Sequence, residues 1–157
     1  PITTASRRRP NWRIPVITDV NEQVQQIPWL MSRFVEQTPG VSDAVCVSSD
    51  GLLMAMSTGL DRARADQFAA IAAGLTSLSL GASRCFGYGE VDQVMVEMST
   101  GFLFVASISD GSCLGILSTK DADVGLVGYE MTMLVERFGS VLTPQVRAGL
   151  RSVLAAV

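Results

Sequence analysis

The sequence predicts a small α+β domain, and three patterns support this prediction. Two Asp-Gly dipeptides, Asp50-Gly51 and Asp110-Gly111, each join a pair of short apolar runs, which is the strongest short-range signal of a β-hairpin. A long stretch rich in Ala and Leu, with its apolar residues at helical spacing, separates the two hairpins. A further helical stretch follows the second hairpin. The predicted order is therefore helix, two strands, helix, three strands, helix.

The first half of this order starts with a helix that we expect near Ile27. Pro28 suits the first turn of a helix, and Pro39-Gly40 ends it. The first hairpin then comprises strands over residues 41–48 and 52–57. Along the first of these strands, alternate residues face opposite sides of the sheet, and both sides are apolar.

A long helix from about Asp61 to Gly81 has two distinct faces. One face is the expected core stripe, with apolar residues at helical spacing: Phe68, Ile71, Ala72, Leu75, Leu78 and Ser79. The second face is mostly small: Asp66, Ala69, Ala73, Thr76 and Ser77. Small residues allow another helix to approach closely, and the high helix propensity of Ala explains the same composition equally well.

The second half of the chain holds strands over residues 91–98, 102–109 and 113–119. The middle strand is apolar on both faces, which places it inside a sheet that is covered on two sides. A helix over residues 124–138 follows, with acidic residues at its start and Gly139 at its end. Thr143-Pro144 then opens a short amphipathic helix.

These elements divide the 157 residues into three parts: an arm over residues 1–26, a domain over residues 27–140 and a short helix over residues 141–157. The arm carries Arg7, Arg8, Arg9 and Arg13, which leaves the rest of the chain acidic. We interpret it as a solvated tail, not as a site for nucleic acid. The strand-like spacing of Trp12, Ile14 and Val16 also allows it to add to a sheet edge.

Composition excludes several classes of chemistry. The chain has no histidine, so it lacks the commonest metal ligand and the usual general base at neutral pH. Cys46, Cys85 and Cys113 have no C-x-x-C spacing and are interpreted as free, mostly buried thiols. We expect no metal and no cofactor. No apolar run reaches the roughly 20 residues of a membrane span, so we expect a cytoplasmic protein without stable membrane insertion.

Motifs for nucleotide or acid–base chemistry are also missing. The chain contains no G-x-x-x-x-G-K-[ST] sequence, and Gly87-Tyr88-Gly89 lacks the flanking strand and helix of a phosphate loop. Ser48 and Ser49 have no base that would activate them. The protein is therefore not predicted to be an enzyme, and its 48% hydrophobic content suits a surface reserved for a partner.

The order of elements, together with the segments PGVSDAVCVSSDGLLMAMS, GEVDQVMVEMSTGFLFVASISDGSCLGIL and DADVGLVGYEMTMLV, resembles the Roadblock family of dynein light chains and bacterial GTPase regulators. The resemblance covers about residues 27–140 and is narrowest with the Roadblock proteins of actinobacterial conservon operons. It implies a five-stranded antiparallel sheet that pairs with a second copy along the strand over residues 91–98. It also implies that the long helices of the two copies lie side by side.

This resemblance assigns candidate roles to particular residues. The homodimer interface would comprise Asp66, Ala69, Ala73 and Thr76 on the long helix and Val94 and Val96 on the strand. Members of the bacterial branch bind a small Ras-like GTPase, so Arg62, Arg64 and Arg84 are candidates to face that partner. For each arginine a local ion pair, such as Arg62 with Asp66 at i,i+4, is the simpler explanation.

Two other functions fit the same sequence. The first is a ligand-sensing domain with a deep apolar pocket, which Phe102, Phe104 and Met54 would line. The second is a scaffold that assembles a sensor kinase or other partners and leaves nucleotide turnover unchanged. In either case any recruitment to the membrane would occur through partners.

Overall fold

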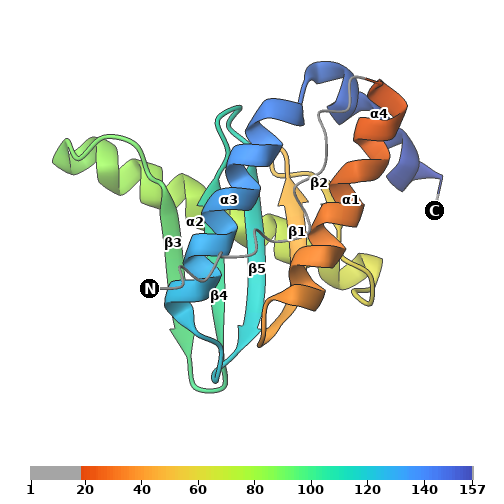
Figure 1. The fold of residues 1–157 in the computed structure, drawn as a ribbon. Helices are drawn as coiled ribbons and strands as arrows, with labels where there is room; N and C mark the ends of the chain where they lie inside the picture. Colours follow the sequence, from red (N-terminus) through yellow and green to blue (C-terminus); the bar gives the residue numbers. More distant parts are fainter. Residues whose placement is uncertain (1–18, 157) are drawn as a thin grey trace, which may run out of the picture.

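The computed structural model describes residues 19–156, and the predicted order of helices and strands is confirmed there (Figure 1). The predictions for residues 1–18, including the strand-like spacing around Trp12, lie outside the described residues. The elements are α1 (Val20–Gln37), β1 (Val41–Val47), β2 (Leu53–Met56), α2 (Arg62–Phe86), β3 (Gln93–Met98), β4 (Gly101–Ser107), β5 (Cys113–Thr119), α3 (Val124–Val141) and α4 (Pro144–Ala155).

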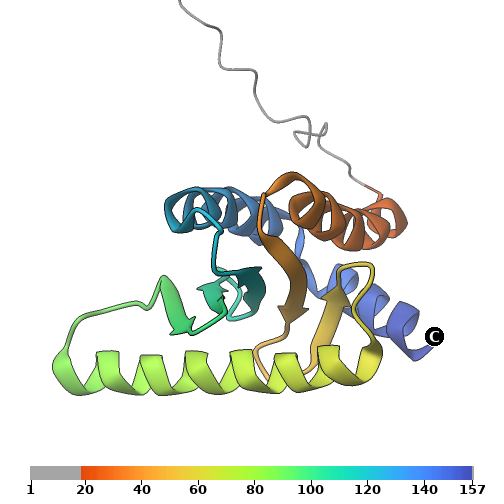
Figure 2. The ribbon, with the colours of Figure 1, turned by 90° about the horizontal axis from the view of Figure 1, so that it is seen from below.

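All five strands form one antiparallel sheet in the order β2-β1-β5-β4-β3, which confirms the predicted fold class. The two Asp-Gly hairpins are β1–β2 and β4–β5, and the pairing of β1 with β5 joins them. Helices α1 and α3 cover one face of the sheet, and α2 crosses the other face (Figure 2). The sheet edges are therefore β2 and β3.

Two hydrophobic clusters lie on opposite faces of the sheet. The first joins α1, α3 and α4 to the sheet, and the second joins α2 to it; we call them the α1–α3 cluster and the α2 cluster. Alternate residues of β4 enter different clusters: Phe104 belongs to the first, and Leu103 and Val105 belong to the second. The prediction that this strand is covered on both faces is therefore confirmed.

The two Asp-Gly turns have the same hydrogen-bonding pattern. The Ser48 N–H donates to the Leu52 carbonyl at 2.8 Å, and the Gly51 N–H donates to the Ser48 carbonyl at 2.9 Å. Equivalent bonds of 2.8 and 3.0 Å close the second turn. Gly51 has a φ of 83° and Gly111 a φ of 88°, values that L side chains adopt with strain. The Asp-Gly signal therefore works through the glycine, as predicted.

The predicted start of the first helix near Ile27 is wrong. Helix α1 begins at Val20, and the Asp19 side chain caps it by accepting hydrogen bonds from the N–H groups of Asn21 and Glu22, at 2.8 and 3.2 Å. Pro28 therefore lies within the helix. Residues 20–26, which we expected in the arm, are helical.

Two helices also run further than predicted. Helix α2 continues past Gly81 to Phe86 and ends at Gly87, which has a left-handed backbone. Helix α3 passes through Gly139 and ends at Val141. A Cβ at Gly139 would lie 2.9 Å from the Ser109 Oγ, so this glycine allows α3 to approach the second hairpin turn and does not end the helix.

Candidate functional site

The outer side of β3 is open. Among residues 19–156, β3 pairs only with β4. The Ser107 N–H donates to the Asp92 carbonyl at 3.1 Å, which fixes the alternation of hydrogen bonds along this pair. The backbone groups of Gln93, Met95 and Glu97 consequently point away from β4. They form an unpaired edge of the kind that adds another strand.

Helix α2 extends beyond this open edge. Val94 and Val96 of β3 pack into the α2 cluster together with Leu75. The C-terminal end of the helix, up to Phe86, continues past β3, as both views of the ribbon show (Figures 1 and 2). We call this end of α2 the overhang.

An apolar stripe follows one flank of α2 into the overhang. Its members recur at intervals of three or four residues and share one side of the helix: Ile71, Leu75, Leu78, Ala82 and Phe86. Leu78 is 76% exposed, Phe86 69% and Ile71 52%. We call these five residues the α2 stripe.

The prediction that Ile71 and Leu78 belong to the core is therefore wrong. The residues of α2 that are buried under the sheet are Ala65, Phe68, Ala69 and Ala72. Their spacing and that of the stripe are both helical, so the sequence pattern alone does not separate the covered face from the uncovered one. Only the width of the sheet and the position of α2 beneath it do so.

By length and composition, α2 is the one helix in the described part of the chain that could cross a membrane. Core helices of globular proteins pass the same test. The buried residues of its first half are part of the α2 cluster, and Arg62 and Arg84 stand near its two ends. The apolar overhang of α2 also explains why this helix is long and apolar enough to pass the test for a membrane span.

The small face of α2 contacts its own subunit. Ala69 is buried in the α2 cluster, which leaves it inaccessible to a second copy. A Cβ at Gly51 would lie 3.3 Å from the Ala73 Cβ, so the small side chain of Ala73 accommodates the first hairpin turn. The Thr76 Oγ1 donates to the Ala72 carbonyl at 2.9 Å. Of the four α2 residues predicted at a dimer interface, Asp66 alone is exposed, and it pairs with Arg62.

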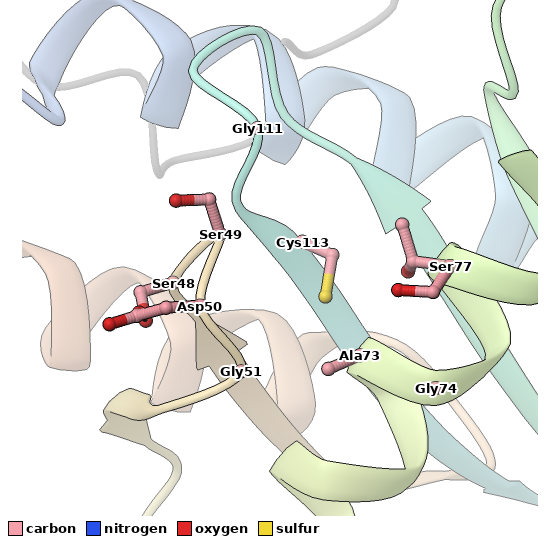
Figure 3. A pocket seen from close by; sticks show the side chains of 10 residues that line it. Ser48, Ser49, Asp50, Gly51, Ala73, Gly74, Ser77, Gly111 and Cys113 are labelled. Carbon is pink, nitrogen blue, oxygen red and sulfur yellow. The ribbon is translucent and has the colours of Figure 1, made fainter.

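A hollow of about 260 Å³ lies between this small face and the two hairpin turns (Figure 3). Ser49 and Asp50 line it from one turn, Gly111 lines it from the other, and Ala73 and Ser77 line it from α2. Its lining is uncharged apart from Asp50, and it lies on the flank opposite the α2 stripe. The small residues therefore shape a surface depression within one subunit.

The three predicted arginines do not come together within one subunit. Arg62 Nε lies 3.1 Å from Asp66 Oδ1, and Arg62 Nη1 donates to the Leu154 carbonyl at 3.2 Å. Arg64 lies 3.8 Å from Asp61 with most of its side chain exposed. Arg84 is exposed near the far end of α2, about 30 Å away at 1.5 Å per residue. The local pairing of Arg62 at i,i+4 is confirmed.

The thiols follow the structural interpretation at two of three positions. Cys46 and Cys113 are buried, and Cys85 is exposed. Burial raises the pKa of the Cys46 thiol and that of the Cys113 thiol. Both groups are consequently protonated and unreactive at neutral pH.

Two carboxylates have their pKa shifted by neighbouring hydroxyls. A hydrogen bond from Ser48 lowers the pKa of Asp50, and one from Thr119 lowers the pKa of Asp121. Both acids lie in turns, where they accept hydrogen bonds as local turn residues do. Within residues 19–156, no group of three or more metal-ligating side chains is placed to hold an ion.

The pocket expected for a ligand-sensing domain is filled by side chains. Phe104 and Met54 are each 1% exposed, and Phe102 is also buried; all three are packed in the α1–α3 cluster. The rings of Phe102 and Phe104 are 5.9 Å apart. These residues form core, so the feature that favoured a sensor over an adaptor is not present at these positions.

Comparison with known proteins agrees with this architecture. The sequence profile of the Roadblock/LC7 domain matches residues 27–118. A Roadblock/LC7 domain from Streptomyces avermitilis is 43% identical, with a TM-score of 0.70, and the match covers 73% of this chain and 96% of that one. A second domain from the same organism is 36% identical, with a TM-score of 0.60, over 71% and 97% of the two chains.

Myxococcus xanthus MglB shares the fold at 15% identity, with a TM-score of 0.68 over 74% of this chain and 94% of that one. No functionally curated protein matches with significance. The profile covers more than half of the 157 residues, and the Streptomyces domain is well above 30% identical. The chain belongs to the Roadblock/LC7 family.

Proposed function

We propose that two copies of the chain pair through β3 and the α2 stripe, and that this homodimer is a non-catalytic adaptor for a small Ras-like GTPase. The observation that carries the proposal is the coincidence of an open strand edge with an apolar helix overhang on the same side of the sheet. An open strand edge and an exposed apolar patch each favour aggregation of a single copy, and a second copy covers both.

The dimensions of the two features support pairing. Adjacent strands lie about 4.8 Å apart and one helical turn is about 5.4 Å long, so each turn of α2 beyond β3 reaches beneath roughly one strand of a second copy. A two-fold axis between the β3 strands makes the two α2 helices antiparallel. Leu78 and Phe86 of each copy then lie against α2 and the sheet of the other. Val94 and Val96 remain at the interface, as predicted, because they flank the pairing edge.

The proposed helix–helix contact lies on the flank of α2 opposite the small face, and not on the small face itself. The predicted interface residues Ala69 and Ala73 are occupied within their own subunit, by the sheet and by the first hairpin turn. The α2 stripe takes their place. Asp66 is exposed and Thr76 is partly exposed, and neither belongs to the proposed helix–helix contact.

A dimer of this kind carries the exposed arginines of both copies on one layer. The antiparallel α2 helices place Arg84 of each copy beneath the sheet of the second copy, on the layer that also carries the Arg64 of that copy, while Arg62 is held by Asp66. The α2 layer of the dimer therefore has two equivalent sets of basic side chains, which suit acidic switch residues or a phosphate group.

The functional test uses a purified small Ras-like GTPase, loaded either with GDP or with a non-hydrolysable GTP analogue. We expect the two proteins to co-purify, and we expect the chain to change GTP hydrolysis or nucleotide release. Arg64→Ala and Arg84→Ala should weaken the complex, whereas Arg33→Ala, on the opposite layer, should not. Absence of binding in both nucleotide states would contradict the proposal. Binding with unchanged turnover and release would instead support the scaffold function, including one that assembles a sensor kinase.

A further inference from the structure

Helix α4 crosses the edge of the sheet at β2, from one layer of the domain to the other. Val146 and Leu150 are buried in the α1–α3 cluster, on one face of the sheet. Leu154, one turn later, packs against the α2 cluster on the other face. Figure 2 shows α4 beyond β2, at the margin opposite the α2 overhang.

Polar contacts along the length of α4 hold it to the rest of the subunit. Arg147 pairs with Asp110 of the second hairpin turn at 3.0 Å, and Arg151 lies 3.8 Å from Asp50 of the first. The carbonyl of Leu154 accepts a hydrogen bond from Arg62 at the start of α2. The helix therefore contacts both hairpin turns and the helices of both layers.

A glycine sets how closely α4 packs. A Cβ at Gly149 would lie 2.5 Å from the Val24 Cγ2 of α1, so any side chain there would push the two helices apart. Glycine inside a helix is destabilising relative to alanine. Its presence is explained by the close approach of α4 to α1.

The strand next to α4 has few other protections. β2 is four residues long, and its residues Leu53, Met54 and Ala55 are buried, with apolar side chains facing both clusters. It carries no lysine, proline or inward-pointing charge, the usual devices that keep an edge strand from pairing. The two features that protect β2 from pairing are its short length and the adjacent α4.

We infer that α4 is an edge guard that keeps β2 from pairing with a second copy of this chain, and so limits assembly to two copies. The inference rests on the proposed homodimer through β3. A subunit with two open edges, each able to pair with its own kind, has two different two-fold interfaces. Such a subunit builds an open-ended sheet, and a subunit with one open edge stops at a dimer.

The test combines displacement of α4 with a block of β3. Gly149→Leu displaces α4 by the clash with Val24 and strengthens helix propensity, so it does not act by unwinding α4. Leu150→Asp displaces it by charge, and Ser152→Asp is the matched control on the exposed side. Met95→Pro blocks β3, because the Met95 N–H points away from β4 and only a second copy would use it.

Mass is measured by light scattering over a hundredfold range of concentration, with circular dichroism to establish that each variant is folded. We expect two copies for the parent and the control, one copy for Met95→Pro, and species larger than two that grow with concentration for either α4 variant. The double variant, Gly149→Leu with Met95→Pro, should stop at two copies joined through β2. Aggregation from misfolding would show no such limit, and would contradict the inference.

The outcomes separate this inference from the proposed function. A dimeric parent whose folded α4 variants remain dimers overturns the edge guard alone. A monomeric parent whose α4 variants become dimers overturns the β3 homodimer and leaves the edge guard standing. If the two single variants behave as expected but the double variant stays monomeric, that result also contradicts the edge guard.

Discussion

Replacement of Leu78 by alanine should weaken the dimer strongly and leave the folded subunit unchanged. Leu78 is 76% exposed in one subunit, so nearly its whole side chain is available for burial against a second copy. Full burial of a leucine contributes roughly 1.5–3 kcal/mol, which gives about 1–2 kcal/mol for the exposed part of each copy. Two copies lose about 2–4 kcal/mol, and at 1.4 kcal/mol per tenfold this raises the dimer Kd by about 30- to 700-fold.

Sedimentation equilibrium over a dilution series measures this Kd directly. Leu52→Ala is the matched control, because Leu52 is also a large exposed leucine (56%) but lies in the first hairpin turn, away from β3 and the overhang. We expect the control to bind as the parent does, and both variants to keep the parent's far-UV circular dichroism spectrum. An equal Kd for Leu78→Ala and the parent would refute the assignment of the α2 stripe to the interface.

Three further predictions concern the subunit itself. Arg147→Ala should lower the free energy of unfolding by about 1–2 kcal/mol, because it strips a largely buried carboxylate of its cation, whereas Arg151→Ala, at an exposed pair, should cost under about 0.5 kcal/mol by urea titration. Ser48→Ala should raise the pKa of Asp50 toward its ordinary 3.8, and carboxyl NMR measures this change. Because the pKa is lowered in the folded protein, the hydrogen bond stabilises the fold above pH 3.8, and this stabilisation is lost as the pH falls through the folded-state pKa. With a thiol-reactive dye, Cys85 should label far faster than the other two cysteines in native protein, and comparable rates for all three would contradict their burial.

Local signals predicted much of the fold. The Asp-Gly turns, the two-faced β4 strand and the Thr143-Pro144 helix start each depend on neighbouring residues, and all three are confirmed. The start of α1 also had a local signal that we missed. Asp19 followed by Glu22 three residues later is the pattern of a helix N-cap with an acidic first turn. Pro28 favours a helix start because proline is common in the first turn, but here it lies within the helix.

Other features depend on the tertiary arrangement. The core stripe and the exposed stripe of α2 have the same spacing, and the sheet ends beneath the helix at a point that no local pattern marks. The small side chain of Ala73 suits the approach of another helix, but it makes room for the Gly51 turn of the same subunit. Gly139 has the local pattern of a helix end, but it makes room for Ser109 of the second hairpin. In both cases a close contact between distant segments requires the small residue.

The amide exchange rate at Met95 tests the central claim most directly. This N–H points away from β4, so within a single copy it is an unpaired group on an open edge. If two copies join through β3, hydrogen–deuterium exchange at Met95 should be as slow as at Val94, and it should become fast in the dissociated Leu78→Ala variant. Fast exchange at Met95 beside a protected Val94, in protein that sediments as a dimer, would show that the copies meet elsewhere.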